Sequence, residues 1–392
     1  MTRTLQNRLK RQLAKRQVIF LVLGCSVVIG LVLVVFALTS QRYPGDQGSS
    51  DNDVAAAGEF IEAPRETERE PLGAGAPPLS LGIGGDVTFG LAVADIIERE
   101  GPGYPWTDVS VLFGEYDLTI VNLESPLCRG GETHPDQSSL YLRGDTSCAA
   151  PMATAGVDAV CLANDHIMDY GSAGLEETLN ILRGENLGAF GAGSNRRAAE
   201  QSLVLEVDNG ARVALLSFCD VAPPSYTAGG SSPGISASSL DRIEEAVGRA
   251  AEETPYVVVY LHWGELGSTE ITSRQRELAR ACIQAGADLV VGCHPHVVQG
   301  IEVIDGIPVV YSLGNLVFSS EDEAGKKGIF VGCRFGGGSL TGLEVIPLRV
   351  AEAKPLPLAR EQAEIFLREL DVASPAVQLE ISPETGTAAL PL

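Results

Sequence analysis

Beyond residue 78, short apolar runs alternate with longer amphipathic segments. Runs that are apolar on both faces predict buried β-strands. These strands are expected at residues 79–85, 117–124, 158–164, 212–218, 256–264, 288–293 and 308–315. Apolar residues spaced three and four positions apart predict helices, which are expected at residues 94–100, 173–186, 239–253, 274–287 and 358–370. Buried strands separated by helices predict an α/β fold whose sheets are largely parallel and covered on both sides.

The first 39 residues follow a different pattern. Residues 1–17 contain six basic residues and no acidic one, and residues 18–39 form a run of 22 residues without a charge. Such a run is long enough to cross a bilayer at about 1.5 Å per residue. A cleaved signal peptide is the alternative, but its apolar part spans only roughly 7 to 15 residues. The pattern predicts a cytoplasmic segment at 1–17 and a single transmembrane helix at 18–39 in the cell membrane, with the rest of the chain outside the cytoplasm.

The remaining boundaries follow from composition. Residues 40–78 are rich in Gly, Pro, Ser, Asp and Glu and have little apolar periodicity, which predicts a disordered extracytoplasmic linker. Residues 79–374 are expected to form the folded domain. Residues 375–392 are expected to be a loose C-terminal tail.

Charge and cysteine content exclude two classes of function. Residues 18–392 hold 22 basic and 51 acidic residues, a net charge of −29, so nucleic acid and anionic lipid are poor partners for the general surface. Solubility or adaptation to salt explains the acidity at least as well as a functional role does. The eight cysteines contain no C-x-x-C pair, which argues against a zinc ribbon. Whether Cys128 and Cys148 form a disulfide stays open.

Polar side chains suited to metal binding follow the predicted strands where each strand ends. Residues at the carboxyl ends of neighbouring parallel strands converge in space, so these side chains are expected to form one site. The candidates are Asp86, Asn122, Glu124, Asn164, Asp165, His166, His262, Glu265, His294, His296 and Asn315. Mixed imidazole, carboxylate and amide ligands suit a divalent transition metal such as Mn, Zn or Fe better than Ca or Mg.

Several of these positions also have a structural interpretation. Asp86 is equally well explained as a turn or cap residue, Asn122 and Asn315 as hydrogen-bonded structural amides, and Glu265 as a helix cap. In the His294-Pro-His296 segment, an extended backbone would point the rings to opposite faces. A turn at the proline would instead let the two rings straddle a two-ion site.

With these segments in view, the chain resembles a known family. The segments GDVTFG, NLESPL, LANDH with DYG, HWGE, GADLVVGCHPHVVQG and YSLGNLVF, in this order over about residues 80–350, are similar to those of CapA or PgsA-type poly-γ-glutamate capsule synthesis proteins. That family is a branch of the metallophosphoesterase-like superfamily. The resemblance implies a layered sandwich of mixed, largely parallel sheets flanked by helices, preceded by one transmembrane helix.

The resemblance also implies roles for individual residues. His166 would be the general acid, and Glu124 would bridge two ions. One ion would be held by Asp86 and His296, and the other by Asp165, His262 and His294.

The chain departs from the superfamily pattern at the first strand and after the third. Thr88 stands where the superfamily's Asp-x-His has histidine, so one ion loses an imidazole and a site for a single ion remains open. Asp165 stands where the family usually has asparagine, which gives a harder, charged ligand. Leu266 and Gly267 follow HWGE where an aromatic residue is usual, and Leu316 stands in place of phenylalanine.

The resemblance implies a membrane-anchored extracytoplasmic protein of poly-γ-glutamate capsule biosynthesis, export or anchoring. Its expected partners are membrane-bound polyglutamate synthase or ligase components and an anionic polymer or envelope substrate, which Arg129 and Arg143 are candidates to contact. Two alternatives remain: a metal-dependent phosphoesterase or amidase acting on cell-envelope material, and a non-catalytic assembly scaffold with a vestigial site. Whether the chain is an enzyme, a hydrolase of this superfamily, is therefore open.

Overall fold

The computed structural model describes residues 75–136 and 140–392. The predicted cytoplasmic segment, the predicted transmembrane helix at 18–39 and the predicted linker as far as residue 74 lie outside the described residues. Among the residues that are described, no helix is long and apolar enough to cross a bilayer.

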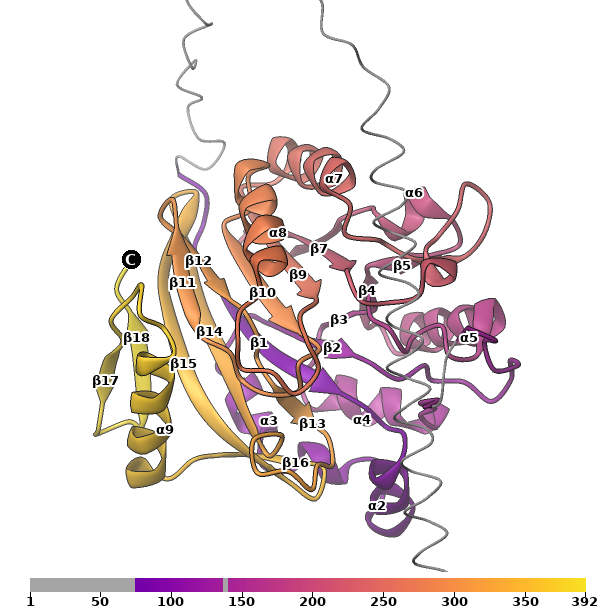
Figure 1. The fold of residues 1–392 in the computed structure, drawn as a ribbon, viewed down its shortest axis with the longest axis horizontal. Helices are drawn as coiled ribbons and strands as arrows, with labels where there is room; N and C mark the ends of the chain where they lie inside the picture. Colours follow the sequence, from indigo (N-terminus) through magenta and orange to yellow (C-terminus); the bar gives the residue numbers. More distant parts are fainter. Residues whose placement is uncertain (1–74, 137–139) are drawn as a thin grey trace, which may run out of the picture. The chain divides into compact units, whose positions relative to one another are not determined.

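Most strands belong to two mixed sheets (Figure 1). The larger sheet contains β1 (Leu79–Val87), β2 (Leu118–Leu123), β3 (Ala159–Cys161), β4 (Gly188–Phe190), β13 (Asn315–Val317), β14 (Lys327–Gly336), β15 (Ser339–Ala351), β16 (Lys354–Pro357), β17 (Glu380–Ser382) and β18 (Thr387–Leu390). Strands β1 to β4 and β13 pair with one another in parallel. Strands β14 to β18 form only antiparallel pairs. The parallel half of this sheet carries the first group of predicted site residues.

The smaller sheet has the strand order β11-β12-β10-β9-β7-β6. Its strands are β6 (Leu203–Glu206), β7 (Arg212–Cys219), β9 (Tyr256–His262), β10 (Leu289–Cys293), β11 (Ile301–Ile304) and β12 (Ile307–Val310). The four inner strands are parallel, and an antiparallel strand closes each edge. A short antiparallel pair, β5 (Ala192–Gly193) with β8 (Gly234–Ile235), stands apart from both sheets.

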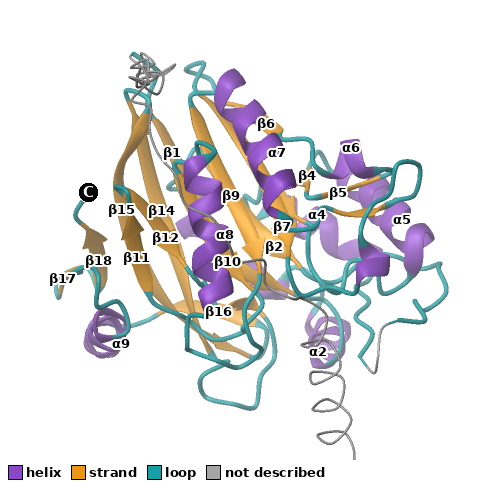
Figure 2. Ribbon diagram, turned by 45° about the horizontal axis from the view of Figure 1, so that its top comes forward, coloured by secondary structure: helices purple, strands orange, loops and turns teal. Residues whose placement is uncertain are grey.

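The helices are α2 (Ala92–Glu100), α3 (Ser110–Phe113), α4 (Ala149–Thr154), α5 (Gly171–Gly184), α6 (Arg196–Ala199), α7 (Leu240–Glu253), α8 (Ser273–Gln284) and α9 (Arg360–Val372). Most of them cover the outer faces of the two sheets (Figure 2), whereas α9 packs against the core between the sheets. Helices α2 to α5 pack on the larger sheet, and α7 and α8 pack on the smaller one. Between the sheets, side chains such as Leu81 of β1 and Val258 of β9 share one apolar core. The layers run helix, sheet, sheet, helix.

The mixed α/β fold is confirmed, and so are the predicted helices and strands, except that the strand predicted at 308–315 is divided between β12 in the smaller sheet and β13 in the larger one. The prediction of largely parallel sheets is correct only for the region around the candidate site. The long antiparallel strands β14 and β15 were not predicted. The prediction of a loose tail at 375–392 is wrong, because β17 and β18 extend the larger sheet by pairing with β15, and Leu379, Ala388 and Leu390 are buried there.

The cysteines of the described residues are all free and buried. Cys128 and Cys148 therefore form no disulfide in this structure. Burial raises the pKa of the Cys148 thiol to about 12, which leaves it protonated and unreactive at neutral pH.

Candidate metal centre

A bulge in β1 prepares the first site residue. Ile83 pairs with Ile120 and Asp86 with Asn122, so β1 has one more residue than β2 between these pairs. Bulges of this kind bend a strand and redirect a side chain. Gly85 is required within the bulge, because a Cβ there would lie 2.0 Å from the carbonyl oxygen of Gly314.

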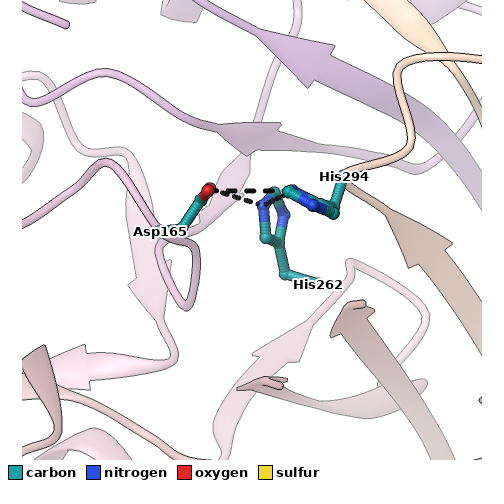
Figure 3. Close-up of side chains that lie close together, drawn as sticks. All are labelled: Asp165, His262 and His294. Carbon is teal, nitrogen blue, oxygen red and sulfur yellow. Dashed lines mark hydrogen bonds and ion pairs between the residues drawn. The ribbon is translucent and has the colours of Figure 1, made fainter. Parts of the chain in front are cut away.

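Asp165, His262 and His294 form the first cluster of candidate ligands (Figure 3). His262 Nε2 lies 2.9 Å from Asp165 Oδ1 and 3.2 Å from His294 Nδ1. His294 Nδ1 lies 3.8 Å from Asp165 Oδ2. One ligand atom from each residue lies within 4.8 Å of the others, a spacing that suits a single cation.

Asp86, Glu124 and His296 form the second cluster. His296 lies 3.3 Å from Asp86 Oδ2 through Nδ1 and 3.4 Å from Glu124 Oε1 through Nε2. Asn122 Nδ2 donates a hydrogen bond of 2.7 Å to Asp86 Oδ1, and the backbone N–H of His294 donates one of 3.2 Å to Asp86 Oδ2. The second cluster is therefore tied to the first through the main chain.

Glu124 lies between the two clusters. Its side chain is fully buried, and neither carboxylate oxygen has a hydrogen-bond partner. Oε1 lies 3.4 Å from His296 Nε2 of the second cluster and 3.7 Å from His262 Nε2 of the first. A buried carboxylate without donors is costly, and buried polar groups are normally satisfied. The residues present fit a pair of divalent cations that share Glu124.

The segment joining the two histidines has an unusual backbone. His294 has φ 98° and His296 has φ 56°, a region that side chains other than glycine adopt rarely and at a cost. The backbone N–H of Gly267 donates a 2.8 Å hydrogen bond to the Pro295 carbonyl and holds the turn. The ring centroids lie 6.3 Å apart, with one ring in each cluster. The turn therefore directs one ring to each cluster, as a site for two ions requires.

The two clusters differ in charge. Burial and the neighbouring His262 lower the pKa of His294 to about 4, so this ring is neutral at pH 7 and its Nδ1 can act as a ligand. Burial opposes the charged form of His296, but the charges of Glu124 and Asp86 raise its pKa to about 10. Burial raises the pKa of Glu124 to about 7.

His166 lies beside the clusters and is paired with a residue that the sequence analysis missed. Its Nδ1 lies 2.8 Å from Asp169 Oδ2, which also accepts a 2.6 Å bond from the Leu142 N–H. Asp169 Oδ1 accepts a 3.2 Å bond from the Tyr226 hydroxyl. Burial opposes protonation of His166, but the bond to Asp169 and nearby carboxylates raise its pKa to about 9. The spacing of three residues from His166 was a signal for Asp169; nothing local marks Tyr226.

The predicted amides orient the candidate ligands through hydrogen bonds. Asn164 Nδ2 donates to Asn122 Oδ1 at 3.2 Å, and Asn122 in turn holds Asp86. Asn315 Nδ2 donates to the Gly325 carbonyl at 2.8 Å, which turns Oδ1 toward His296 Nδ1, also at 2.8 Å. With Nδ1 donating to Asn315, His296 presents Nε2 toward Glu124, as outer-shell partners of metal ligands commonly arrange.

Three positions lie outside the two clusters. Glu265 is exposed, and its carbonyl accepts a turn hydrogen bond from the Ser268 N–H, so the structure does not bring it to the site. Thr88 is buried, but its hydroxyl accepts a 3.2 Å bond from the Gly90 N–H. His134 packs its ring against Tyr226 with centroids 4.7 Å apart.

Arg129 and Arg143 lie in the loop between β2 and α4 and contact the N-terminal part of α5 and the residue before it. The guanidinium carbon of Arg143 lies 3.6 Å from the ring centroid of Tyr170. Its Nη1 donates to the Arg129 carbonyl at 3.4 Å. Neither arginine belongs to a cluster.

Known structures overlap with this fold only in part. An NAD nucleotidase from Haemophilus influenzae is 14% identical with a TM-score of 0.40, covering 76% of this chain and 63% of that one. A calcineurin-like phosphoesterase from Bacillus subtilis is 15% identical with a TM-score of 0.39, covering 72% and 89%. Both TM-scores are below 0.5, so these overlaps carry none of the functional argument.

Sequence relatives are more informative. The PGA biosynthesis protein CapA of Bacillus subtilis (strain 168) is 30% identical over 294 residues, 74% of this chain and 77% of that protein. The capsule biosynthesis protein CapA of Bacillus anthracis is 30% identical over 286 residues, 71% and 69% of the two chains. A probable polyglutamine synthesis accessory protein of Mycobacterium tuberculosis (strain ATCC 25618 / H37Rv) is 27% identical over 272 residues, 64% and 71%.

A family model described as bacterial capsule synthesis protein PGA_cap matches residues 80–320. This range begins with β1 and ends beyond β13, so it contains both clusters, Glu124 and the His166–Asp169 pair. The match covers more than half of the chain. The chain therefore belongs to the bacterial capsule synthesis protein PGA_cap family.

Proposed function

We propose that this chain is a membrane-anchored protein of poly-γ-glutamate capsule biosynthesis, export or anchoring, whose extracytoplasmic domain holds a two-metal centre of metallophosphoesterase type. Membership of the PGA_cap family and the capsule-related names of its relatives support the capsule role. The uncharged run at 18–39 supports the membrane anchor. The two ligand clusters support the metal centre.

One observation carries the metal centre: the buried carboxylate of Glu124, which has no hydrogen-bond donor and faces both clusters. In the proposal Glu124 bridges two ions. Asp165, His262 and His294 hold one ion, and Asp86 and His296 hold the other. Their mixture of imidazole and carboxylate suits Mn, Zn or Fe, and the bound ions would supply Lewis acidity to an oxygen of the bound group.

The proposed partners follow from the same role. The domain would work beside membrane-bound polyglutamate synthase or ligase components and contact the anionic polymer. Positioned amides such as Asn315 keep the ligand rings in place before any substrate binds. Nucleic acid is not a proposed partner, because the chain has a net charge of −23.

A second candidate function is hydrolysis of a phosphoester or amide in the cell envelope. The His166–Asp169 pair favours it, because polymer binding alone does not require an acid catalyst. Asp169 holds His166 through Nδ1, and a pKa of about 9 keeps the ring protonated at pH 7. His166 Nε2 would give its proton to the oxygen or nitrogen of the leaving group as the bond to it breaks.

The direct test is the metal content of the full chain, purified in detergent, by elemental mass spectrometry. The wild type is expected to bind about two transition-metal ions per chain. A variant carrying His294→Ala and His296→Ala removes one imidazole from each cluster and should lose both ions. His134→Ala is the matched control, since His134 belongs to neither cluster, and it should retain the wild-type content.

The function is tested with the same variants in cells that make the capsule. Loss of surface polymer in the double variant but not in His134→Ala would support a working metal centre in capsule assembly. Polymer levels that do not change when the metal is lost would contradict this proposal and leave a scaffold. Release of phosphate or amine from envelope material by the purified wild type, abolished in the double variant, would favour the hydrolase.

A further inference from the structure

The loop between β2 and α4 brings Arg143 close to the catalytic candidate His166. Leu142, the preceding residue, donates its backbone N–H to Asp169 Oδ2 at 2.6 Å, the same oxygen that holds His166. Gly144, the following residue, donates its N–H to the Pro126 carbonyl at 2.9 Å. The backbone on both sides of Arg143 is therefore held by hydrogen bonds, one of them to the partner of His166.

The Arg143 side chain is also held in one orientation. Its guanidinium lies over the Tyr170 ring, with Cζ 3.6 Å from the ring centroid, and Nη1 donates to the Arg129 carbonyl at 3.4 Å. Nε is buried and has no acceptor. Among the described residues, no carboxylate forms a salt bridge with Arg143. Arg143 as a whole is only partly buried, and its one hydrogen bond among the described residues is the one from Nη1, so Nη2 is left for a ligand.

A guanidinium held this way differs from an ordinary surface charge. Stacking on an aromatic ring fixes the plane of the group, and the planar fork matches a carboxylate through two parallel hydrogen bonds. Little side-chain entropy remains to be lost on binding. An acidic polymer also meets a chain with a net charge of −23, so its attachment needs a local cation.

We infer that Arg143, stacked on Tyr170, is the anchor for a side-chain carboxylate of an acidic polymer whose neighbouring unit then lies against His166 and the two ligand clusters. This inference rests on the proposed function and names the substrate class of that site. Arg143 is in this sense a specificity-determining residue, and Tyr170 and the Arg129 carbonyl are its positioning groups.

The test is binding of a fluorescent γ-glutamyl oligomer of about ten units to the full chain in detergent, measured by fluorescence anisotropy. Arg143→Ala is expected to weaken binding by about tenfold or more, the size of a charge-assisted bidentate pair. Arg143→Lys keeps the charge but loses the fork, so it should recover only part of this loss. Tyr170→Leu should fall between the wild type and Arg143→Ala.

Arg183→Ala is the matched control, because Arg183 lies near the opposite end of α5 from Tyr170 and its loss changes the net charge equally. It should bind the oligomer as the wild type does. Equal weakening in Arg183→Ala, unchanged binding in Arg143→Ala with a normal melting temperature, or no binding by the wild type would each overturn the inference. Stronger competition by inorganic pyrophosphate than by glutarate would also overturn it, since the anchor would then recognise phosphate.

Metal content is measured on the same samples, with and without chelator, to separate the two proposals. Wild-type metal content in Arg143→Ala together with weaker oligomer binding supports the anchor. A wild type without metal that still binds the oligomer through Arg143 would remove the metal centre and keep the anchor. A wild type that holds metal but does not bind the oligomer would keep the metal centre and remove the anchor.

Discussion

His166 lies beside Asp165 of the first ligand cluster, and the carboxylates around it decide its charge. Burial alone would lower the pKa of the ring, yet the hydrogen bond to Asp169 and nearby carboxylates raise it to about 9. A histidine with a raised folded-state pKa stabilises the protein fully below its unfolded pKa, about 6.5, and loses this contribution as the pH rises through 9. The His166–Asp169 pair therefore keeps a proton on the ring at neutral pH and also stabilises the fold there.

We expect Asp169→Asn to lower the pKa of His166 clearly below 9 in chelator-treated protein, although Asp165 and Glu124 still favour the charged ring. The variant removes the charged acceptor and leaves the burial that disfavours the imidazolium. NMR titration of the ring C–H signals measures the shift, with the His166 signal assigned by its absence in His166→Gln. The His134 signal is the internal control. A pKa that stays near 9 in Asp169→Asn would show that Asp169 does not hold the proton.

At the scale of elements, an aspartate stands directly before three of the parallel strands. Asp117 precedes β2, Asp158 precedes β3 and Asp288 precedes β10. Each accepts a backbone N–H from the start of the neighbouring strand, at 2.7 Å from Ser80, 2.7 Å from Thr119 and 2.8 Å from Val257, respectively. These carboxylates satisfy donors at the amino ends of the strands, away from the candidate metal centre, so they align the sheets without serving the site.

The contribution of Asp288 to stability should depend on pH. Burial raises its pKa to about 7, so the folded state binds more protons than the unfolded state between about pH 4 and pH 7. The unfolding free energy should therefore fall as the pH rises through this range, by up to about 4 kcal/mol. Asp288→Asn keeps a carbonyl acceptor and should lose this fall, whereas Asp288→Ala also leaves the Val257 N–H unpaired and should destabilise the protein by about 1–2 kcal/mol at pH 5.

Urea unfolding at pH 5 and pH 8 checks this prediction. The comparison uses the difference between the two pH values in each variant, so other titrating groups cancel. An equal pH dependence in the wild type and Asp288→Asn would contradict it.

The same scale shows what the sequence could predict. Strands such as β9 and β10 are continuous apolar runs, and parallel neighbours must end together, so residues after them were predictable as one site. β14 and β15 were missed, although they form a long antiparallel pair. Their place depends on which strand they pair with, and β14 pairs with β1 some 250 residues earlier. The contact of Tyr226 with Asp169 likewise depends on how a loop folds back.

At the scale of the whole domain, the candidate metal centre lies where the two sheets meet. Asp86 and Glu124 come from β1 and the end of β2 in the larger sheet, whereas His262 and His294 come from β9 and the end of β10 in the smaller one. Below them, the Tyr260 hydroxyl of β9 donates at 3.1 Å to the Ile120 carbonyl of β2. Bound ions would therefore join the two sheets, and their binding energy would add to the stability of the fold.

The variant Glu124→Gln separates the stability that bound ions add from the stability that packing provides. In chelator, burial raises the pKa of Glu124 to about 7, so wild-type stability should fall as the pH rises from about 4.5 through 7. The variant carries no charge to desolvate and should be more stable by about 1–3 kcal/mol at pH 8. With saturating Mn²⁺ the order should reverse, because the wild type gains about 2.7 kcal/mol at one hundred times its dissociation constant and the variant lacks the bridging carboxylate. Melting temperatures of the full chain with chelator and with Mn²⁺ measure both; a variant that is less stable under both conditions would mean that Glu124 is held by the protein alone.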